Sequence, residues 1–302
     1  MNPVALALVL AAAGLHASWN LFAKRAGGGS GGPAFVFSFS LLTVVVFAPF
    51  AIPQGGLRAP EAGVAALVAV VGSALLHIGY FLSLQRSYRI GDLSLVYPLA
   101  RGVGPVLATL GAIAWLGERP SAWALAGTSL VVTATFILAS GRSGGRLGPG
   151  VDGSGLETHA RRWAPGLGWG LVTAAFIGGY TLWDARAVAH VGVPPLPFLW
   201  WTQVALTALL APLALRRPAD VRHAWRHHRG AVIAVGTLSP LAYLLVLTAF
   251  TLAPVSLVAP LRETSVLIGA WLGLTLLGEQ GRGRRLVAAA VMVVGAALLA
   301  RG

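Results

Sequence analysis

Residues 93–118, LSLVYPLARGVGPVLATLGAIAWLGE, are echoed later in the chain by residues 255–279, VSLVAPLRETSVLIGAWLGLTLLGE. With one single-residue gap, the alignment pairs like residues at offsets of 162 and 161: Pro98 with Pro260, Arg101 with Arg262, and Glu118 with Glu279. A second match at an offset of 161 joins SWNLFAKRA at 18–26 to GYTLWDARA at 179–187. Two separated matches at nearly the same spacing indicate an internal repeat.

The composition predicts that both copies of the repeat lie in a membrane. The chain has 302 residues, of which 56% are hydrophobic and only 10% are charged. Ordinary soluble domains carry about 25% charged residues. Apolar runs of about 20 residues recur along the whole chain, and each can cross about 30 Å of hydrocarbon as a helix. The sequence therefore predicts an all-α, polytopic membrane protein. Because it contains no cysteine, disulfides, thiolate metal sites and cysteine nucleophiles are excluded.

Turn residues and charges divide these runs into ten expected spans: 3–23, 34–53, 63–85, 93–116, 121–140, 166–186, 195–215, 230–250, 254–277 and 284–300. The longest polar break, 141–165, is rich in Gly and charge and is typical of a mobile linker. We therefore expect a first five-helix repeat over 1–140, a cytoplasmic linker over 141–165 and a second five-helix repeat over 166–302. Because each repeat has an odd number of helices, the second repeat enters the membrane from the side opposite to the first. The fold prediction is ten transmembrane helices arranged as two inverted five-helix repeats.

Positive charge sets the expected orientation. The net charge is +13, which could suggest nucleic-acid binding, but basic residues also mark the cytoplasmic loops of membrane proteins. Sixteen of the 22 Lys and Arg residues lie in loops on one side, four lie on the other, and Arg101 and Arg262 fall inside spans. The positive-inside rule then places both termini on the non-cytoplasmic side, with Lys24 and Arg25 as a cytoplasmic anchor.

The two five-helix repeats, the SWNLFAKRA element and a Leu-Gly-Glu after the fourth and ninth spans resemble the drug/metabolite transporter superfamily, EamA type. The resemblance covers nearly the whole chain, and the HASWN element is similar to amino-acid and metabolite exporters, including the YddG-like ones. It implies a multi-pass protein of the bacterial inner (plasma) membrane whose cavity is lined mainly by helices 1, 3, 4, 6, 8 and 9.

The function expected from this resemblance is secondary transport: export of amino acids, including aromatic ones, or of related small metabolites, by alternating access. A lipid-linked or nucleotide-sugar carrier and a channel are the alternatives. An enzyme is not expected, because no nucleophile–base set or metal motif appears. The expected partners are a small-molecule substrate and membrane lipids, without nucleic acid, metal or cofactor, and the chain is treated as a monomer. The residues leave the substrate, the direction and the coupling ion open.

Polar and aromatic residues inside the spans are the candidate substrate-binding side chains, because unpaired polar groups are costly in lipid. Several share a helix face at i, i+3 or i+4 spacing. The candidates are His16, Trp19, Asn20, His77, Tyr80, Tyr97 and Arg101 in the first half, and Tyr180, Tyr243, Arg262, Glu263 and Thr264 in the second. For each His alone, a structural interhelical histidine is the competing interpretation.

The charged candidates have two interpretations. Arg101 and Arg262 either anchor an anionic group such as a carboxylate or bond structurally to helix carbonyls or Glu263. Because neighbours on a helix point about 100° apart, Glu263 is not expected to face Arg262; His77 or water is the expected partner, and a proton-coupling role is considered.

Residues at span ends, and prolines and glycines inside spans, receive structural predictions. Glu118 and Glu279 are expected to complement the helix that follows each of them, and Asp184 is expected at the membrane interface. Gly269 and Gly273 are expected to form a close-packing face. Pro98 and Pro260 are predicted hinges, with static kinks as the alternative.

Overall fold

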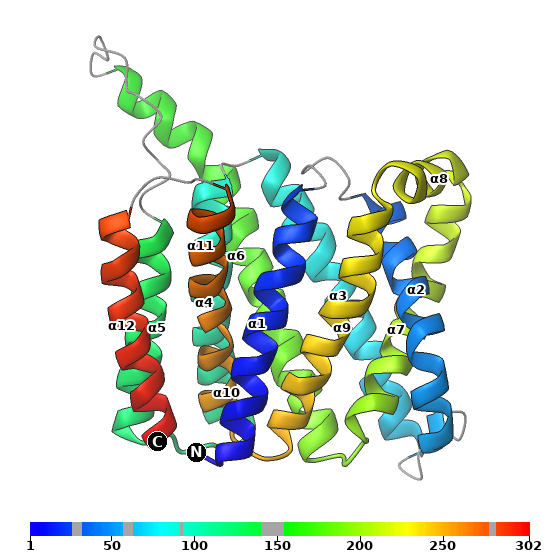
Figure 1. Cartoon of the computed structure of the whole chain (residues 1–302), viewed down its shortest axis with the longest axis horizontal. Helices are drawn as coiled ribbons and strands as arrows, with labels where there is room; N and C mark the ends of the chain where they lie inside the picture. Colours follow the sequence, from blue (N-terminus) through cyan, green and yellow to red (C-terminus); the bar gives the residue numbers. More distant parts are fainter. Residues whose placement is uncertain (26–31, 57–62, 91–92, 140–153, 278–281) are drawn as a thin grey trace.

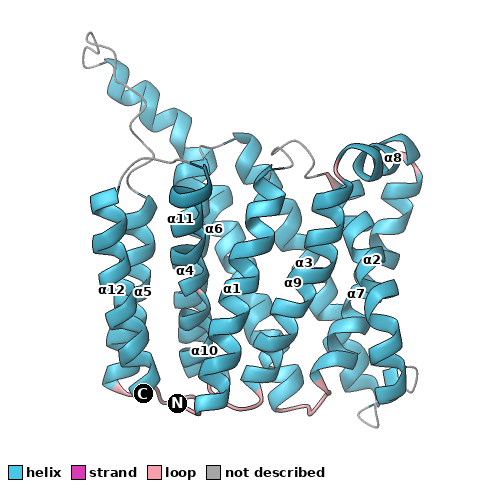
Figure 2. Ribbon diagram, in the orientation of Figure 1, coloured by secondary structure: helices cyan, strands magenta, loops and turns pink. Residues whose placement is uncertain are grey.

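The computed structural model describes residues 1–25, 32–56, 63–90, 93–139, 154–277 and 282–302, and these residues form helices joined by short loops, without a strand (Figure 2). The helices are α1 (Pro3–Arg25), α2 (Pro33–Ala51), the π-helical turn η1 (Ile52–Gly56), α3 (Gly63–Ile90), α4 (Leu93–Trp115), α5 (Ala122–Ala139), α6 (Ser154–Ala189), α7 (Pro195–Leu215), α8 (Pro218–His227), α9 (Arg229–Phe250), α10 (Val255–Arg262), α11 (Thr264–Leu277) and α12 (Arg282–Arg301).

The helices fit the predicted spans closely. Each of the ten predicted spans falls on one helix or on a consecutive pair. Within the described residues, six helices are long and apolar enough to cross a membrane: Pro3–Asn20, Pro33–Gln54, Gly63–Leu84, Pro195–Leu215, Arg229–Phe250 and Gly283–Arg301. Shorter apolar helices lie at Leu99–Trp115 and Ala122–Leu138. Large apolar side chains such as those of Val45, Val64 and Leu286 are exposed on the outside, as expected for a surface that faces lipid.

The helices depart from the predicted spans at three places. The expected loop after α7 contains α8, which begins with Pro218 at its first turn, where a proline fits a helix. The expected linker 141–165 is helical from Ser154 onward, because its Gly-rich part ends there and helix-forming residues follow; residues 141–153 lie outside the described residues. The expected span 254–277 is interrupted between α10 and α11.

The bundle brings together helices that are far apart in sequence. The helix α1 packs against α9 and α11, α6 packs against α3 and α4, α2 packs against α7, and α5 packs against α12. Both termini lie at one end of the bundle, where the Met1 amino group donates a hydrogen bond to the Ala300 carbonyl at 2.9 Å, and α8 lies at the other end (Figure 1). Both termini lie at the same end when the chain crosses the bundle an even number of times.

Glycines of α5 and α12 let the backbones of these two helices approach each other closely. A Cβ atom on Gly127 would lie 2.7 Å from the Gly295 carbonyl oxygen, and one on Gly295 would lie 2.9 Å from the Gly127 carbonyl oxygen. By contrast, a Cβ on Gly269 would meet nothing within 4 Å. The predicted close-packing face at Gly269 is therefore wrong, because small-residue spacing within one helix does not say where its neighbour lies. Gly273 falls outside the described side chains.

We predict that Gly127→Ala destabilises the bundle whereas Gly14→Ala, which has open space for its Cβ, does not. Both changes gain the same helix propensity, about 1 kcal/mol, so their difference isolates the packing clash, which costs about 1–3 kcal/mol. The apparent melting temperature of each purified variant in detergent measures the effect. Equal melting temperatures for the two variants would show that α5 and α12 are not in close contact.

Candidate functional site

The break between α10 and α11 positions two charged side chains inside the bundle. Pro260 lacks an N–H and interrupts the helical hydrogen-bond pattern near the end of α10. The Glu263 N–H then bonds to the Pro260 carbonyl at 3.0 Å, and the Val266 N–H bonds to the Glu263 carbonyl at 2.9 Å, both with a three-residue spacing. Arg262 thus ends α10 and Glu263 precedes α11, the positions where a cation and an anion complement the helix dipoles.

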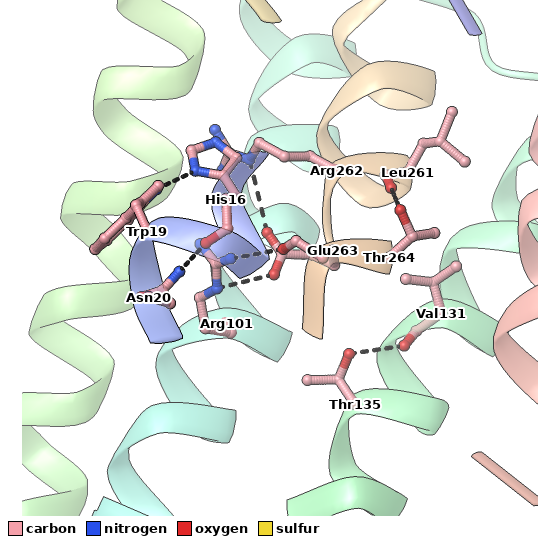
Figure 3. Close-up of polar contacts among 11 residues, drawn as sticks. His16, Trp19, Asn20, Arg101, Val131, Thr135, Leu261, Arg262, Glu263 and Thr264 are labelled. Atoms are coloured by element: carbon pink, nitrogen blue, oxygen red, sulfur yellow. Dashed lines mark hydrogen bonds and ion pairs between the residues drawn. The ribbon is translucent and has the colours of Figure 1, made fainter. Parts of the chain in front are cut away.

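Glu263 joins the two arginines into one buried cluster (Figure 3). Its Oε2 atom lies 3.1 Å from Arg101 Nε, and its Oε1 atom lies 3.7 Å from Arg262 Nε. The side chains of Arg262 and Glu263 are 2% and 1% exposed, and that of Arg101 is 12% exposed. Arg101 Nη2 also donates to Ser265 Oγ at 3.0 Å. Two guanidinium groups and one carboxylate leave this cluster one positive charge in excess.

This geometry corrects the predicted partner of Glu263. The expectation that Arg262 and Glu263 face apart assumed a continuous α-helix, but the chain leaves α-helical geometry between them. The partners of Glu263 are therefore its neighbour Arg262 and Arg101 of the other half, rather than His77. Among the described residues, Arg262 Nη2 is buried without a hydrogen-bond partner, so the cluster keeps one donor available for a ligand.

The helix α1 brings His16, Trp19 and Asn20 to the edge of this cluster (Figure 3). Trp19 Nε1 donates to His16 Nδ1 at 3.0 Å, and Asn20 Nδ2 donates to the His16 carbonyl at 2.7 Å. Because Nδ1 accepts, Nε2 carries the proton of a neutral ring. That atom is buried without a partner in the described residues. His16 therefore presents a second unused donor beside the arginines.

An aromatic group from α3, α6 and α9 lies next to the charged cluster. His77 stacks on Tyr180 with ring centroids 4.4 Å apart, and Tyr243 meets His77 edge-on at 5.5 Å. The Tyr80 ring lies 5.6 Å from that of Tyr180. The guanidinium carbon of Arg262 lies 5.9 Å from the Tyr180 ring centroid, within cation–π range. Arg262 thus connects the charged and aromatic groups.

The remaining predicted site residues have no described contact with the charged cluster or the aromatic group. Thr264 Oγ1 donates to the Leu261 carbonyl at 2.8 Å across the helix break, so its hydroxyl is used within its own chain segment. Tyr97 and Pro98 lie in α4, but their side chains fall outside the described part of the chain. The binding role of all these residues stays a prediction, as do the hinge roles of Pro98 and Pro260.

Asp184 was not among the predicted site residues, because the predicted span ended close to it. The helix α6 continues to Ala189, and Asp184 is fully buried between helices, whereas its predicted position at the membrane interface stays a prediction. The Tyr243 hydroxyl donates to its Oδ2 atom at 2.6 Å, whereas Oδ1 has no partner in the described residues. The i, i+4 spacing of Tyr180 and Asp184, which places both on one helix face, was the available signal.

Glu118 complements a helix N-terminus, but of a helix in the other half of the chain. Its carboxylate accepts hydrogen bonds from the backbone N–H groups of Val255 at 2.7 Å and Ser256 at 3.0 Å. It therefore caps α10, not the α5 helix that follows it. Glu279 lies outside the described residues.

Comparisons with known proteins agree with a transporter. Residues 164–301, slightly less than half of the chain, match the model of the EamA-like transporter family. No curated protein matches the chain. Among solved structures, 29 chains match. One of them, described as the crystal structure of a protein, shares 20% identity with a TM-score of 0.75, over 97% of this chain and 95% of that chain. At this identity the likeness shows a shared fold, which includes the first half of the bundle.

Proposed function

We propose that this chain, whose residues 164–301 match the model of the EamA-like transporter family, is a secondary transporter that exports aromatic amino acids or closely related carboxylates by alternating access. The observation that carries the proposal is the buried contact between Arg262 and the Tyr180 ring. It places a cation with an unused donor beside an aromatic surface, and these two features match the two ends of such a substrate.

The charge of the site supports a carboxylate. A guanidinium group presents paired donors that fit a carboxylate in a bidentate arrangement. The cluster of Arg101, Arg262 and Glu263 holds one excess positive charge, and one carboxylate neutralises it. The nucleotide-sugar and lipid-linked alternatives carry diphosphates. Their negative charge exceeds the single excess positive charge of the cluster.

The neighbouring rings support an aromatic or large apolar side chain. Tyr180 lies between His77, Tyr80 and Tyr243 at centroid distances of 4.4–6.0 Å. Aromatic pairs gain about 0.5–1.5 kcal/mol beyond the burial of their area. A substrate ring that inserts among these side chains would gain comparable contacts.

The packing of the helices supports an inverted repeat of 1–140 and 166–302 around the linker 141–165. In this scheme α6 is the counterpart of α1, α9 of α3, and the α10–α11 pair of α4. The helix α1 packs against α9 and α11, and α6 packs against their counterparts α3 and α4. Exchange of the repeats therefore preserves these contacts. Inverted repeats of this kind rock around a site between the two halves, which favours alternating access over a channel.

We propose that the protein lies in the bacterial inner membrane with both termini on the non-cytoplasmic side. The basic loops support this orientation, and so does α8, whose exposed Arg222 and Arg226 lie at the end opposite the termini. Reporters that are active on one side only, fused to the C-terminus, should give periplasmic activity. Cytoplasmic activity alone would overturn the orientation.

Counterflow in proteoliposomes tests the substrate. Vesicles loaded with unlabelled phenylalanine should take up labelled phenylalanine, whereas empty liposomes should not. External phenylpropionate, which keeps the ring and carboxylate, should compete; phenethylamine, which lacks the carboxylate, should not. Competition by a nucleotide sugar without an effect of phenylalanine would support the carrier alternative. A large ion conductance without counterflow would support a channel.

A further inference from the structure

Asp184 is a buried carboxyl that the proposed substrate contacts do not use. It lies on α6 with no exposed surface. Burial of a carboxylate away from water is costly, so such groups are paired, hydrogen-bonded or protonated. Its Oδ2 atom accepts a hydrogen bond from Tyr243, and Oδ1 has no hydrogen-bond partner among the described residues. One oxygen is therefore free to carry a proton.

Asp184 and Glu263 differ in their surroundings. Glu263 lies within 4 Å of two guanidinium groups and forms an ion pair with each of them. In the described part of the chain, no basic side chain forms an ion pair with Asp184. A carboxyl that forms no direct ion pair can gain and lose a proton more easily than one that is held between two arginines.

Several helices contribute the groups that face Asp184. His77 and Ser73 face it from α3, Tyr243 from α9 and Arg262 from α10. The helix α4 also packs against α6, and its Arg101 contacts Glu263 and Ser265 instead. On α6 itself, the Thr181 hydroxyl is buried without a partner in the described residues. The carboxyl thus lies among hydroxyl donors, an imidazole and the guanidinium group of Arg262.

The repeat also sets Asp184 apart. In the alignment of residues 18–26 with 179–187, Asp184 occupies the position of Ala23. The first half therefore has no carboxyl at this place.

We propose that Asp184 is the proton-binding carboxyl that couples substrate export to the proton gradient. Its carboxylate takes up one proton from the outer aqueous phase to become a carboxylic acid and releases that proton to the cytoplasm as substrate moves outward. Tyr243 donates to the charged form. His77 stacks on Tyr180, which Arg262 contacts, so the proton site and the proposed carboxylate site share one wall. The coupling role rests on the proposed transport function.

The test separates proton-driven accumulation from exchange in proteoliposomes with labelled phenylalanine. In the wild type, an inside-acidic pH gradient should drive accumulation above the external concentration. Asp184→Asn should abolish this accumulation yet retain counterflow, which needs no net proton movement. Asp220→Asn, which removes an exposed carboxylate on α8, is the matched control and should accumulate substrate like the wild type.

Each other outcome is decisive. Normal accumulation by Asp184→Asn would overturn the role of Asp184. Wild-type accumulation that follows a sodium gradient and ignores pH would overturn proton coupling. If counterflow of phenylalanine is absent in the wild type, the proposed substrate is wrong, and infrared spectroscopy still tests the proton site. A protonated-carboxyl band that appears as the pH falls should then be missing in Asp184→Asn, and its presence there would overturn the assignment.

Tyr243→Phe keeps the test available if Asp184→Asn does not fold. Loss of the hydroxyl removes a donor that favours the charged carboxylate. The pH at which the carboxyl band is half-developed should therefore move upward by roughly one unit. An unchanged midpoint would mean that the titrating carboxyl is not Asp184.

Discussion

Glu263→Gln is expected to lower the free energy of unfolding by about 3–5 kcal/mol, the cost of leaving a buried charge without its partner. Glu263 lies within 4 Å of Arg101 and Arg262, and both arginines keep their charge after the substitution. Two guanidinium groups then repel each other inside the bundle. The apparent melting temperature in detergent, together with the yield of folded protein, measures the loss.

A double-mutant cycle with Arg101→Gln separates this electrostatic effect from a change in packing. Arg101→Gln alone leaves Arg262 paired with Glu263, whose side chains approach to 3.7 Å. The double variant leaves only Arg262 charged, so it should be more stable than Glu263→Gln alone. Purely additive losses would show that Arg101 and Glu263 do not interact.

Arg262→Gln is expected to raise the phenylalanine concentration at half-maximal counterflow by about 10–100-fold. A charge-assisted hydrogen bond contributes roughly 1.5–3 kcal/mol, and each 1.4 kcal/mol is a tenfold change. Arg262→Lys should lose less, because it keeps the charge but not the planar, bidentate group. Rates at matched protein abundance over a range of concentrations measure both effects.

The controls distinguish substrate recognition from damage to the fold. Arg222→Gln on α8 removes an exposed arginine far from the break and should leave counterflow unchanged. The competitor phenethylamine, which lacks a carboxylate, should be equally ineffective against the wild type and Arg262→Gln. If Arg262→Gln transports phenylalanine with unchanged affinity, Arg262 does not bind the carboxylate.

The sequence by itself determined the fold class and the positions of the helices. The length of an apolar run and the turn residues that end it are local properties, so each expected span falls on one helix or on a consecutive pair, although α8 and the helical part of the linker were not expected. The pairing of Arg101 with Arg262 in the repeat likewise identified two residues that meet at one site. The sequence did not predict the helix break, which falls after Arg262 rather than at Pro260.

Only the tertiary structure decided which polar groups meet. Glu263 pairs with Arg101 across the two halves, Glu118 caps α10, and Asp184 is buried against Tyr243. Each of these contacts joins residues 59 or more positions apart. The periodicity of one helix says which residues share its face, but the neighbour of that face depends on how the helices pack. A carboxyl near a predicted span end can therefore be exposed or buried between helices, and packing alone buried Asp184.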